Sequence, residues 1–193
     1  MKTRSYTSPL RARAAERTRQ RILQAAYERI SREYYEDVTL DAIAEDAEVT
    51  VQTVLRRFGT KTGLVSAIVE DRTPGVTAQR DEAPVGDIPG AIANLFDHYE
   101  DIGDLVMLLL RQEERVAPFA EVTAFGRAYH NAWIDRVFAP WLAQRTGTGR
   151  RILHDQLVAL CDTYFWYLLR RQQRLPRPQA ERAVVELVQR LLA

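Results

Sequence analysis

The sequence lacks the features of secreted and membrane proteins. Cys161 is the only cysteine among 193 residues, so no internal disulfide can form. The apolar run LVMLLL is far shorter than the roughly 18 residues of a membrane-spanning helix. The N-terminal stretch MKTRSYTSPLRARAAERTRQR carries charges without a following apolar segment, so we expect no secretory signal. These absences favour a cytoplasmic protein that does not insert into a membrane.

Signatures of catalysis and metal binding are missing as well. No Ser-His-Asp, Cys-His or paired-carboxylate arrangement with a sequence signature is present. His98, His130 and His154 fall in three different predicted helices with no cysteine beside them, so they do not predict a metal site. We expect Cys161 to be a buried, inert thiol, with a redox-active thiol as the alternative. The expectation is a protein that is not an enzyme and uses no cofactor.

Basic residues are unevenly distributed along the chain. The net charge is only +1, but residues 1–33 contain nine basic and three acidic side chains. Residues 34–61 contain three basic and six acidic ones, and residues 62–193 contain fifteen and seventeen. A basic N-terminal arm often contacts nucleic acid. Because 25 of the 27 basic residues are arginines, a coding preference for arginine is the alternative explanation.

Hydrophobic residues recur with helical spacing along most of the chain, without strand-like alternation. This pattern predicts an all-α fold. The expected helices cover residues 13–33, 40–47, 51–58, 61–72, 88–102, 104–116, 119–142, 150–173 and 177–192.

Residues 1–72 predict a helix-turn-helix DNA-binding domain with a basic N-terminal arm. Thr39 and Thr50 supply N-cap oxygens for two short helices, which only the segment EVT separates. Gly59 ends the second helix and Thr60 caps the next. Two short helices joined by a tight turn form a unit whose second helix can enter the major groove of DNA.

A loop or hinge is expected at residues 73–90. This stretch, TPGVTAQRDEAPVGDIPG, combines prolines and glycines without hydrophobic periodicity. We expect residues 91–193 to form a larger helical domain beyond this hinge.

About residues 17–70 resemble the TetR family of bacterial transcription regulators. The family pattern runs Ile-Leu-x-Ala-Ala, Thr-x-x-x-Ile-Ala, Val-Ser/Thr, Thr-Leu-Tyr-x-His/Tyr-Phe and Ser/Thr-Lys-x-x-Leu. Its elements occur here, in order and correctly spaced, in TRQRILQAAYERI, in YYEDVTLDAIAEDAEVT and in VQTVLRRFGTKTGLVSAIV. The rest of the chain matches the family only in its layout of helices. The resemblance implies a homodimer that binds double-stranded DNA through the first domain and a small-molecule effector through the second.

The resemblance also implies which residues contact DNA. The expected set is Thr39, Thr50, Val51, Gln52, Thr53, Arg56, Arg57 and Lys61. Thr53 and Lys61 match positions that usually contact phosphates, and we give Arg57 a phosphate role at the usual His/Tyr position. Val51, Gln52 and Arg56 are the expected base contacts, because valine can meet a thymine methyl, glutamine reads adenine and arginine reads guanine.

Three positions depart from the family pattern. Leu55 stands where a tyrosine is common, so one phosphate contact is missing, and Arg57 is a candidate to replace it. Glu48 and Tyr34 replace glycines, so either the local turn differs or strain of about 1 kcal/mol is tolerated. Glu48 also brings a carboxylate near the DNA, where it repels phosphate unless it is turned away. Val54, Leu55 and Phe58 are expected to hold the second short helix against the domain.

In residues 91–193, apolar and aromatic side chains predict a dimer interface and a ligand pocket. We assign the helices Arg150–Gln173 and Arg177–Leu192 to a homodimer four-helix interface, with an intrachain core as the alternative. Ligand pockets are mostly apolar with a few polar groups. The expected lining residues are Phe96, Tyr99, Met107, Leu110, Phe125, Tyr129 and Trp133, and an ordinary core is again the alternative.

The sequence therefore predicts a DNA-binding transcriptional regulator, most simply a repressor released from a palindromic operator by a small molecule. Three alternatives stay open. One is an architectural DNA-binding protein without an effector, the second is an activator, and the third is an enzyme or ligand carrier with a vestigial helix-turn-helix.

Overall fold

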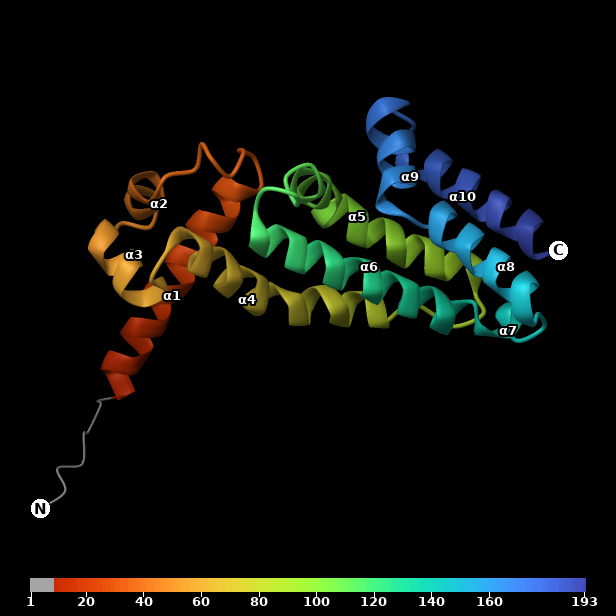
Figure 1. The fold of residues 1–193 in the computed structure, drawn as a ribbon, viewed down its shortest axis with the longest axis horizontal. Helices are drawn as coiled ribbons and strands as arrows, with labels where there is room; N and C mark the ends of the chain where they lie inside the picture. Colours follow the sequence, from red (N-terminus) through yellow and green to blue (C-terminus); the bar gives the residue numbers. More distant parts are fainter. Residues whose placement is uncertain (1–8) are drawn as a thin grey trace, which may run out of the picture. The chain divides into compact units, whose positions relative to one another are not determined.

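The computed structural model describes residues 9–193, and all regular secondary structure in this range is helical, which confirms the predicted all-α fold (Figure 1). The helices are α1 (Pro9–Ile30), α2 (Leu40–Asp46), α3 (Val51–Phe58), α4 (Lys61–Asp81), α5 (Ile88–Leu110), α6 (Ala117–Val137), α7 (Ala139–Leu142), α8 (Gly147–Leu160), α9 (Thr163–Tyr167), a π-helical segment η1 (Leu168–Gln172) and α10 (Arg177–Leu192). None of these helices is long and apolar enough to cross a membrane. The chain divides into two compact units, one ending at Asp71 and the next beginning at Arg72.

The first unit consists of α1, α2, α3 and the first part of α4. α1 packs against α2, and α2 packs against α3. Seven- and eight-residue helices such as α2 and α3 are too short to be stable alone. They are held in place by the core of the unit, in which Ile43 and Val54 are buried, as are Ile22 and Ala26 of α1 and Leu64 of α4.

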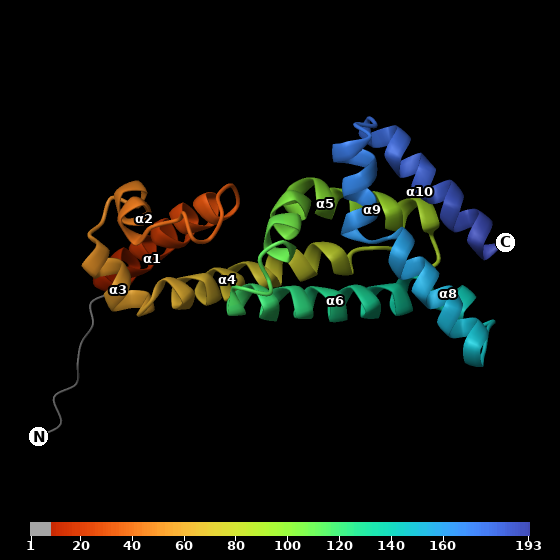
Figure 2. The ribbon, with the colours of Figure 1, turned by 45° about the horizontal axis from the view of Figure 1, so that its top comes forward.

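The second unit is a helical bundle built around α5. α6, α9 and α10 all pack on α5, and α8 contacts both α6 and α10 (Figure 2). Its core is rich in aromatic side chains, and the largest fully buried ones are Trp133, Trp166, Phe96 and Phe138.

The loop expected at residues 73–90 is wrong over most of its length. α4 continues through Pro74 to Asp81, and only residues 82–87 separate it from α5. Burial on this part of α4 does follow the helical period, since Thr73, Val76 and Thr77 are half-buried and Arg80 is buried. The pattern was not recognised because its most buried member is an arginine and the stretch also contains Pro74 and Gly75.

The helix break expected at Gly103 is also wrong, because α5 runs through it. A Cβ atom at this position would lie 2.5 Å from the Trp166 ring. The missing side chain therefore lets α9 approach α5, and Gly103 serves packing rather than chain termination.

Two helices that were predicted as continuous are interrupted. The helix expected over residues 119–142 stops at Phe138, and Pro140 lies in the short α7 that follows. The helix expected over residues 150–173 stops at Cys161, where the Asp162 carboxylate caps α9 by accepting from Tyr164 N at 2.8 Å. Apolar periodicity alone does not detect a break that preserves the buried face on both sides. By contrast, α3 and α10 span the predicted residues 51–58 and 177–192.

Candidate nucleic-acid interface

Side-chain caps fix both ends of the tight turn between α2 and α3. The hydroxyl of Thr39 accepts a hydrogen bond from Ala42 N at 3.1 Å, and that of Thr50 accepts one from Thr53 N at 3.2 Å. Both threonines have extended backbone angles, as N-caps require. The two predicted caps are confirmed, and they orient α3 as a separate helix directly after the turn.

α3 has one buried face and one open face. Val54 is 1% exposed and anchors the helix, with help from the half-buried Phe58, and Val51 is half-buried at the start of the helix. Leu55 is 41% exposed, so the expectation that it holds the helix down is wrong. It stands three residues after Gln52 and next to Arg56, and therefore shares the open face with both.

Two arginines on α3 have no carboxylate partner among the residues that the structure describes. Arg56 and Arg57 are both exposed, and neither forms an ion pair or a side-chain hydrogen bond within residues 9–193. Both guanidinium groups are thus available to another molecule. Beside them, Thr53 is half-buried, and its hydroxyl lies 3.0 Å from that of Thr50.

Lys61 begins α4 and is already held by the protein. Gly59, with φ +74°, ends α3, and the Thr60 hydroxyl accepts from Gly63 N at 2.9 Å to cap α4. The Lys61 ammonium group donates to the carbonyl of Tyr35 and lies 4.0 Å from the centre of the Tyr35 ring. Burial lowers its pKa below the ordinary value. The ammonium group has three donors, so this arrangement fixes its position and leaves donors for an anion.

The two glycine replacements are accommodated in different ways. Glu48 has φ +52° and therefore adopts the left-handed conformation, whereas Tyr34 is not among the described residues with positive φ. Strain is tolerated at Glu48, and the turn differs at Tyr34.

Acidic residues near α3 are paired with α1. The Glu48 carboxylate receives a hydrogen bond from Arg21 at 3.0 Å, and Asp46 receives two from Arg29, one of them at 3.0 Å. The hydrogen bonds from Arg29 lower the pKa of Asp46. These pairs reduce the repulsion that the carboxylates exert on phosphate.

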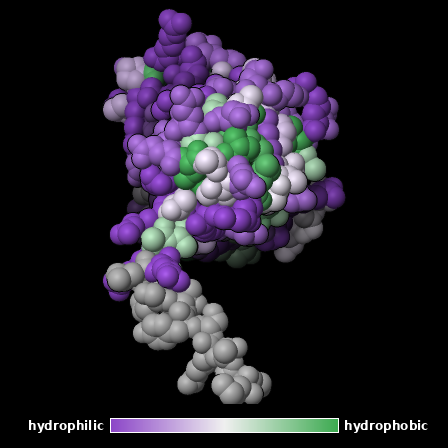
Figure 3. Space-filling model, turned by 90° about the vertical axis from the view of Figure 1, so that its left-hand side faces the viewer, coloured by the Kyte–Doolittle hydropathy of each residue, from purple (hydrophilic) through white to green (hydrophobic). Residues whose placement is uncertain are grey.

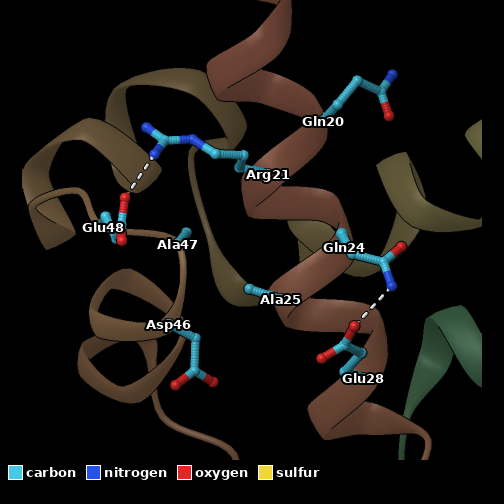
Figure 4. A pocket seen from close by; sticks show the side chains of 8 residues that line it. All are labelled: Gln20, Arg21, Gln24, Ala25, Glu28, Asp46, Ala47 and Glu48. Atoms are coloured by element: carbon cyan, nitrogen blue, oxygen red, sulfur yellow. Dashed lines mark hydrogen bonds and ion pairs between the residues drawn. The ribbon is translucent and has the colours of Figure 1, made fainter.

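A hollow of about 520 Å³ lies between α1 and the end of α2 (Figure 4). Its lining residues are Gln20, Arg21, Gln24, Ala25, Glu28, Asp46, Ala47 and Glu48. Arg21 reaches across it to Glu48, and Gln24 donates to Glu28. Most of the residues around it carry polar side chains, and Arg21, Gln24, Glu28, Asp46 and Glu48 already form hydrogen bonds within the protein.

Figure 3 shows the molecule from the side at which α2 and α3 lie in Figure 1. Hydrophobic residues gather near the centre of this face and hydrophilic residues surround them.

Comparison with known proteins identifies this first unit. Residues 22–68 match the family model of bacterial regulatory proteins, tetR family. Residues 22–68 therefore carry the helix-turn-helix region of the TetR family. The matched segment includes residues 22–30 of α1, both helices of the helix-turn-helix and the start of α4, which are the elements of a DNA-binding unit.

One solved structure extends the similarity to the fold of most of the chain. A transcriptional regulator from Rhodococcus sp. Rha1 has a TM-score of 0.70 at 15% identity, over 90% of this chain and 95% of that chain. A TetR transcriptional regulator from Rhodococcus sp. RHA1 has a TM-score of 0.48 at 20% identity, over 92% and 97%. No curated protein matches.

The residues expected to line a ligand pocket lie in different surroundings in the second unit. Phe96, Tyr99, Met107 and Trp133 are buried, Leu110 and Tyr129 are half-buried, and Phe125 is 48% exposed. The polar groups of three of them have partners inside the unit. Tyr99 donates to Cys161 O at 3.0 Å, Trp133 donates to Arg80 O at 3.2 Å, and the Tyr129 hydroxyl donates to Asp81 at 2.6 Å and lies 3.0 Å from Thr77 O. Ligand binding by this set stays a prediction.

One charged residue in the second unit was missed. Arg80 is buried beside Trp133 and Tyr99, both of which had been assigned to the pocket. Sequence reasoning placed it in a loop. The signal that could have found it was the helical spacing of Thr73, Thr77 and Arg80 across Pro74.

Proposed function

We propose that this TetR-family regulator is a repressor that binds a palindromic operator as a homodimer in the cytoplasm and is released by a small molecule. In each subunit α3 enters a major groove, and the two half-sites lie about one DNA turn or somewhat more apart. Ligand binding in the second unit changes the spacing of the two α3 helices, and the free energy of this coupling comes from the ligand's different affinities for the two states.

The observation that carries the proposal is the open face of α3. Arg56 and Arg57 are exposed and have no partner within residues 9–193, while Gln52 and Leu55 lie beside them. We assign Gln52, Leu55 and Arg56, together with Val51, to base edges, and Leu55 supplies an apolar contact for a thymine methyl. Arg57 is assigned to phosphate.

We assign the remaining predicted contact residues, Thr39, Thr50, Thr53 and Lys61, to phosphates beside Arg57. Thr53 lies on α3 next to the cap Thr50, and Lys61 lies in the first turn of α4, where free backbone N–H groups also attract an anion. Thr39 holds the matching position at the start of α2.

The dimer proposal is supported by apolar side chains exposed on the last helices. They are Ile152, Tyr164, Leu168 and Leu187. On α10 the side chains of Ala180, Val184 and Val188 fill the core of the unit, whereas Leu187, at the edge of the same helix face, is 39% exposed. A second copy of the chain would cover this exposed edge.

Selection from randomised DNA at low salt tests the DNA-binding proposal. The expected result is a two-fold symmetric consensus, and an enriched pool without symmetry or sequence preference would favour an architectural protein. Failure to enrich any DNA would favour the enzyme or carrier alternative. Placing the selected operator before and within a promoter then separates repression from activation.

A pair of matched substitutions tests the dimer. Leu187→Glu introduces a charge into the proposed interface, whereas Val85→Glu introduces the same charge at another exposed hydrophobic residue, in the loop before α5. Light scattering is expected to show a monomer for Leu187→Glu and a dimer for Val85→Glu. A dimer in both variants would move the interface elsewhere.

A further inference from the structure

Arg80 is a fully buried cation in the second unit. Its side chain lies in the last turn of α4 and is only 2% exposed. The guanidinium carbon lies 4.4 Å from the centre of the Trp133 ring and 5.9 Å from that of the Tyr99 ring. Contacts with aromatic faces stabilise the charge in part, but they do not satisfy its N–H donors.

Hydrogen bonding at Arg80 is incomplete. A guanidinium group carries five N–H donors, of which Nη2 lies 3.5 Å from His130 Nδ1 and another interacts with the Tyr99 hydroxyl. The buried Nε has no partner. No ion pair with a carboxylate is formed among these residues, and the neighbouring Asp81 instead accepts from Tyr129 at 2.6 Å.

The titratable groups around Arg80 do not balance its charge. Burial, together with the nearby guanidinium, lowers the pKa of His98 to about 3 and that of His130 to about 4. Burial raises the pKa of the Cys161 thiol to about 12 and also raises that of Tyr99. Near neutral pH all four groups are uncharged. The Arg80 carbonyl, at the end of α4, already accepts from Trp133 and Arg136.

A buried charge without a counter-ion is costly unless a partner arrives from outside. Arginine offers a planar pair of donors that fits a carboxylate, and its surroundings here are aromatic. We propose that Arg80 anchors the effector of this regulator and that the effector is a small organic carboxylate with an apolar body. The proposal rests on the ligand-responsive function proposed above and specifies the chemistry of the ligand.

Removal of the charge tests this role in the ligand-free protein. Arg80→Met keeps similar length while removing the unpaired cation, and its Tm is expected to equal or exceed that of the wild type, by on the order of 3 °C. Arg136→Met is the matched control. Arg136 donates to the carbonyls of Ala83 and Arg80 at 3.0 Å each, so its loss is expected to lower the Tm. A clear fall in Tm for Arg80→Met would show that Arg80 is a structural cation and would overturn the proposal.

Binding of carboxylates to the wild-type protein gives an independent test. Acetate, benzoate, phenylacetate and octanoate are compared with their amides at constant ionic strength, by Tm and by tryptophan fluorescence. At least one acid is expected to raise the Tm by several degrees while its amide does not, and Arg80→Met is expected to lose this shift. An equal shift in the variant, or no acid that exceeds its amide, would overturn the proposal.

Operator binding is measured in the same samples. An acid that binds through Arg80 but leaves the DNA complex intact would support the anion site and contradict ligand-induced release. DNA binding that no tested acid affects, together with the absence of any Arg80-dependent Tm shift, would leave the DNA-binding function intact and reject the carboxylate site.

Discussion

The two units use unpaired arginines in opposite environments. On α3 of the first unit, Arg56 and Arg57 lie in solvent, whereas Arg80 of the second unit lies in a core beside Trp133. Water solvates an exposed cation at little cost, so the α3 arginines do not destabilise the fold when no phosphate or base is bound. A buried cation destabilises the fold until an anion binds. The same side chain therefore suits a salt-sensitive DNA surface in one unit and a selective ligand site in the other.

The largest expected effect is a loss of stability of the second unit in acid, because two histidines near Arg80 resist protonation in the folded protein. Burial lowers the pKa of His98 to about 3 and that of His130 to about 4, from an ordinary value of 6.5. Below pH 6.5 the unfolded chain binds protons that the folded second unit excludes. Its free energy of unfolding is therefore highest above pH 6.5 and falls as the pH decreases, by roughly 3 kcal/mol for His130 alone at pH 4.

Urea unfolding followed by tryptophan fluorescence measures this loss, because Trp133, Trp141 and Trp166 all belong to the second unit. His130→Gln is the control and should flatten the pH dependence. Equal stability of the wild type at pH 7 and pH 4.5 would mean that these histidines are open to protonation in the folded state.

Two glycine-to-alanine substitutions test the close packing of α9 against α5 in the second unit. Gly103→Ala places a Cβ 2.5 Å from the Trp166 ring and is expected to lower the free energy of unfolding by about 1–3 kcal/mol. Gly126→Ala adds the same methyl group to α6, where nothing lies within 4 Å, and should raise it by roughly 0.5–1 kcal/mol. Chemical denaturation measures both. Similar effects of the two substitutions would contradict the close approach of α9 to α5.

The exposed arginines are separated by their effects on specificity. Arg56→Ala is expected to cost roughly 1–3 kcal/mol of operator affinity at one base position. Arg57→Ala should weaken binding to all sequences and reduce the salt slope by about one unit. Titrations of the selected operator and its single-base variants at several salt concentrations measure both quantities. Loss of preference at one base in Arg57→Ala would reverse the two assignments.

The smallest expected effect concerns Glu48. Glu48→Gln removes a carboxylate from the edge of the DNA-binding unit and releases Arg21, so DNA affinity should rise about twofold to fivefold at low salt. Thermal stability should change little, because the lost ion pair is exposed. Glu114→Gln, an exposed position in the second unit, is the control for net charge. Equal gains in both variants would show a general charge effect only.

The helix boundaries of the first unit could be predicted from the sequence because they depend on hydrogen bonds between neighbouring residues. Thr39, Thr50 and Gly59 each act through their own backbone neighbours, and the structure has the caps and the helix end where these residues predict them. Leu55 was misassigned because an apolar residue at an amphipathic position does not show how far the core extends. The DNA contacts themselves stay predictions, since they depend on a second molecule.

The all-α fold and the helix-turn-helix were determined by the sequence alone. Helical periodicity, the helix caps and the ordered TetR motif were sufficient, because caps and periodicity depend on residues that are neighbours in the chain. Tertiary structure alone decided that α4 continues through Pro74, that Gly103 receives Trp166 and that Glu48 pairs with Arg21. It also decided that Arg80 is buried without a carboxylate. The free energy of a charge depends on which groups the fold brings around it, and those groups come from α5, α6 and the α8–α9 junction, far apart in the chain.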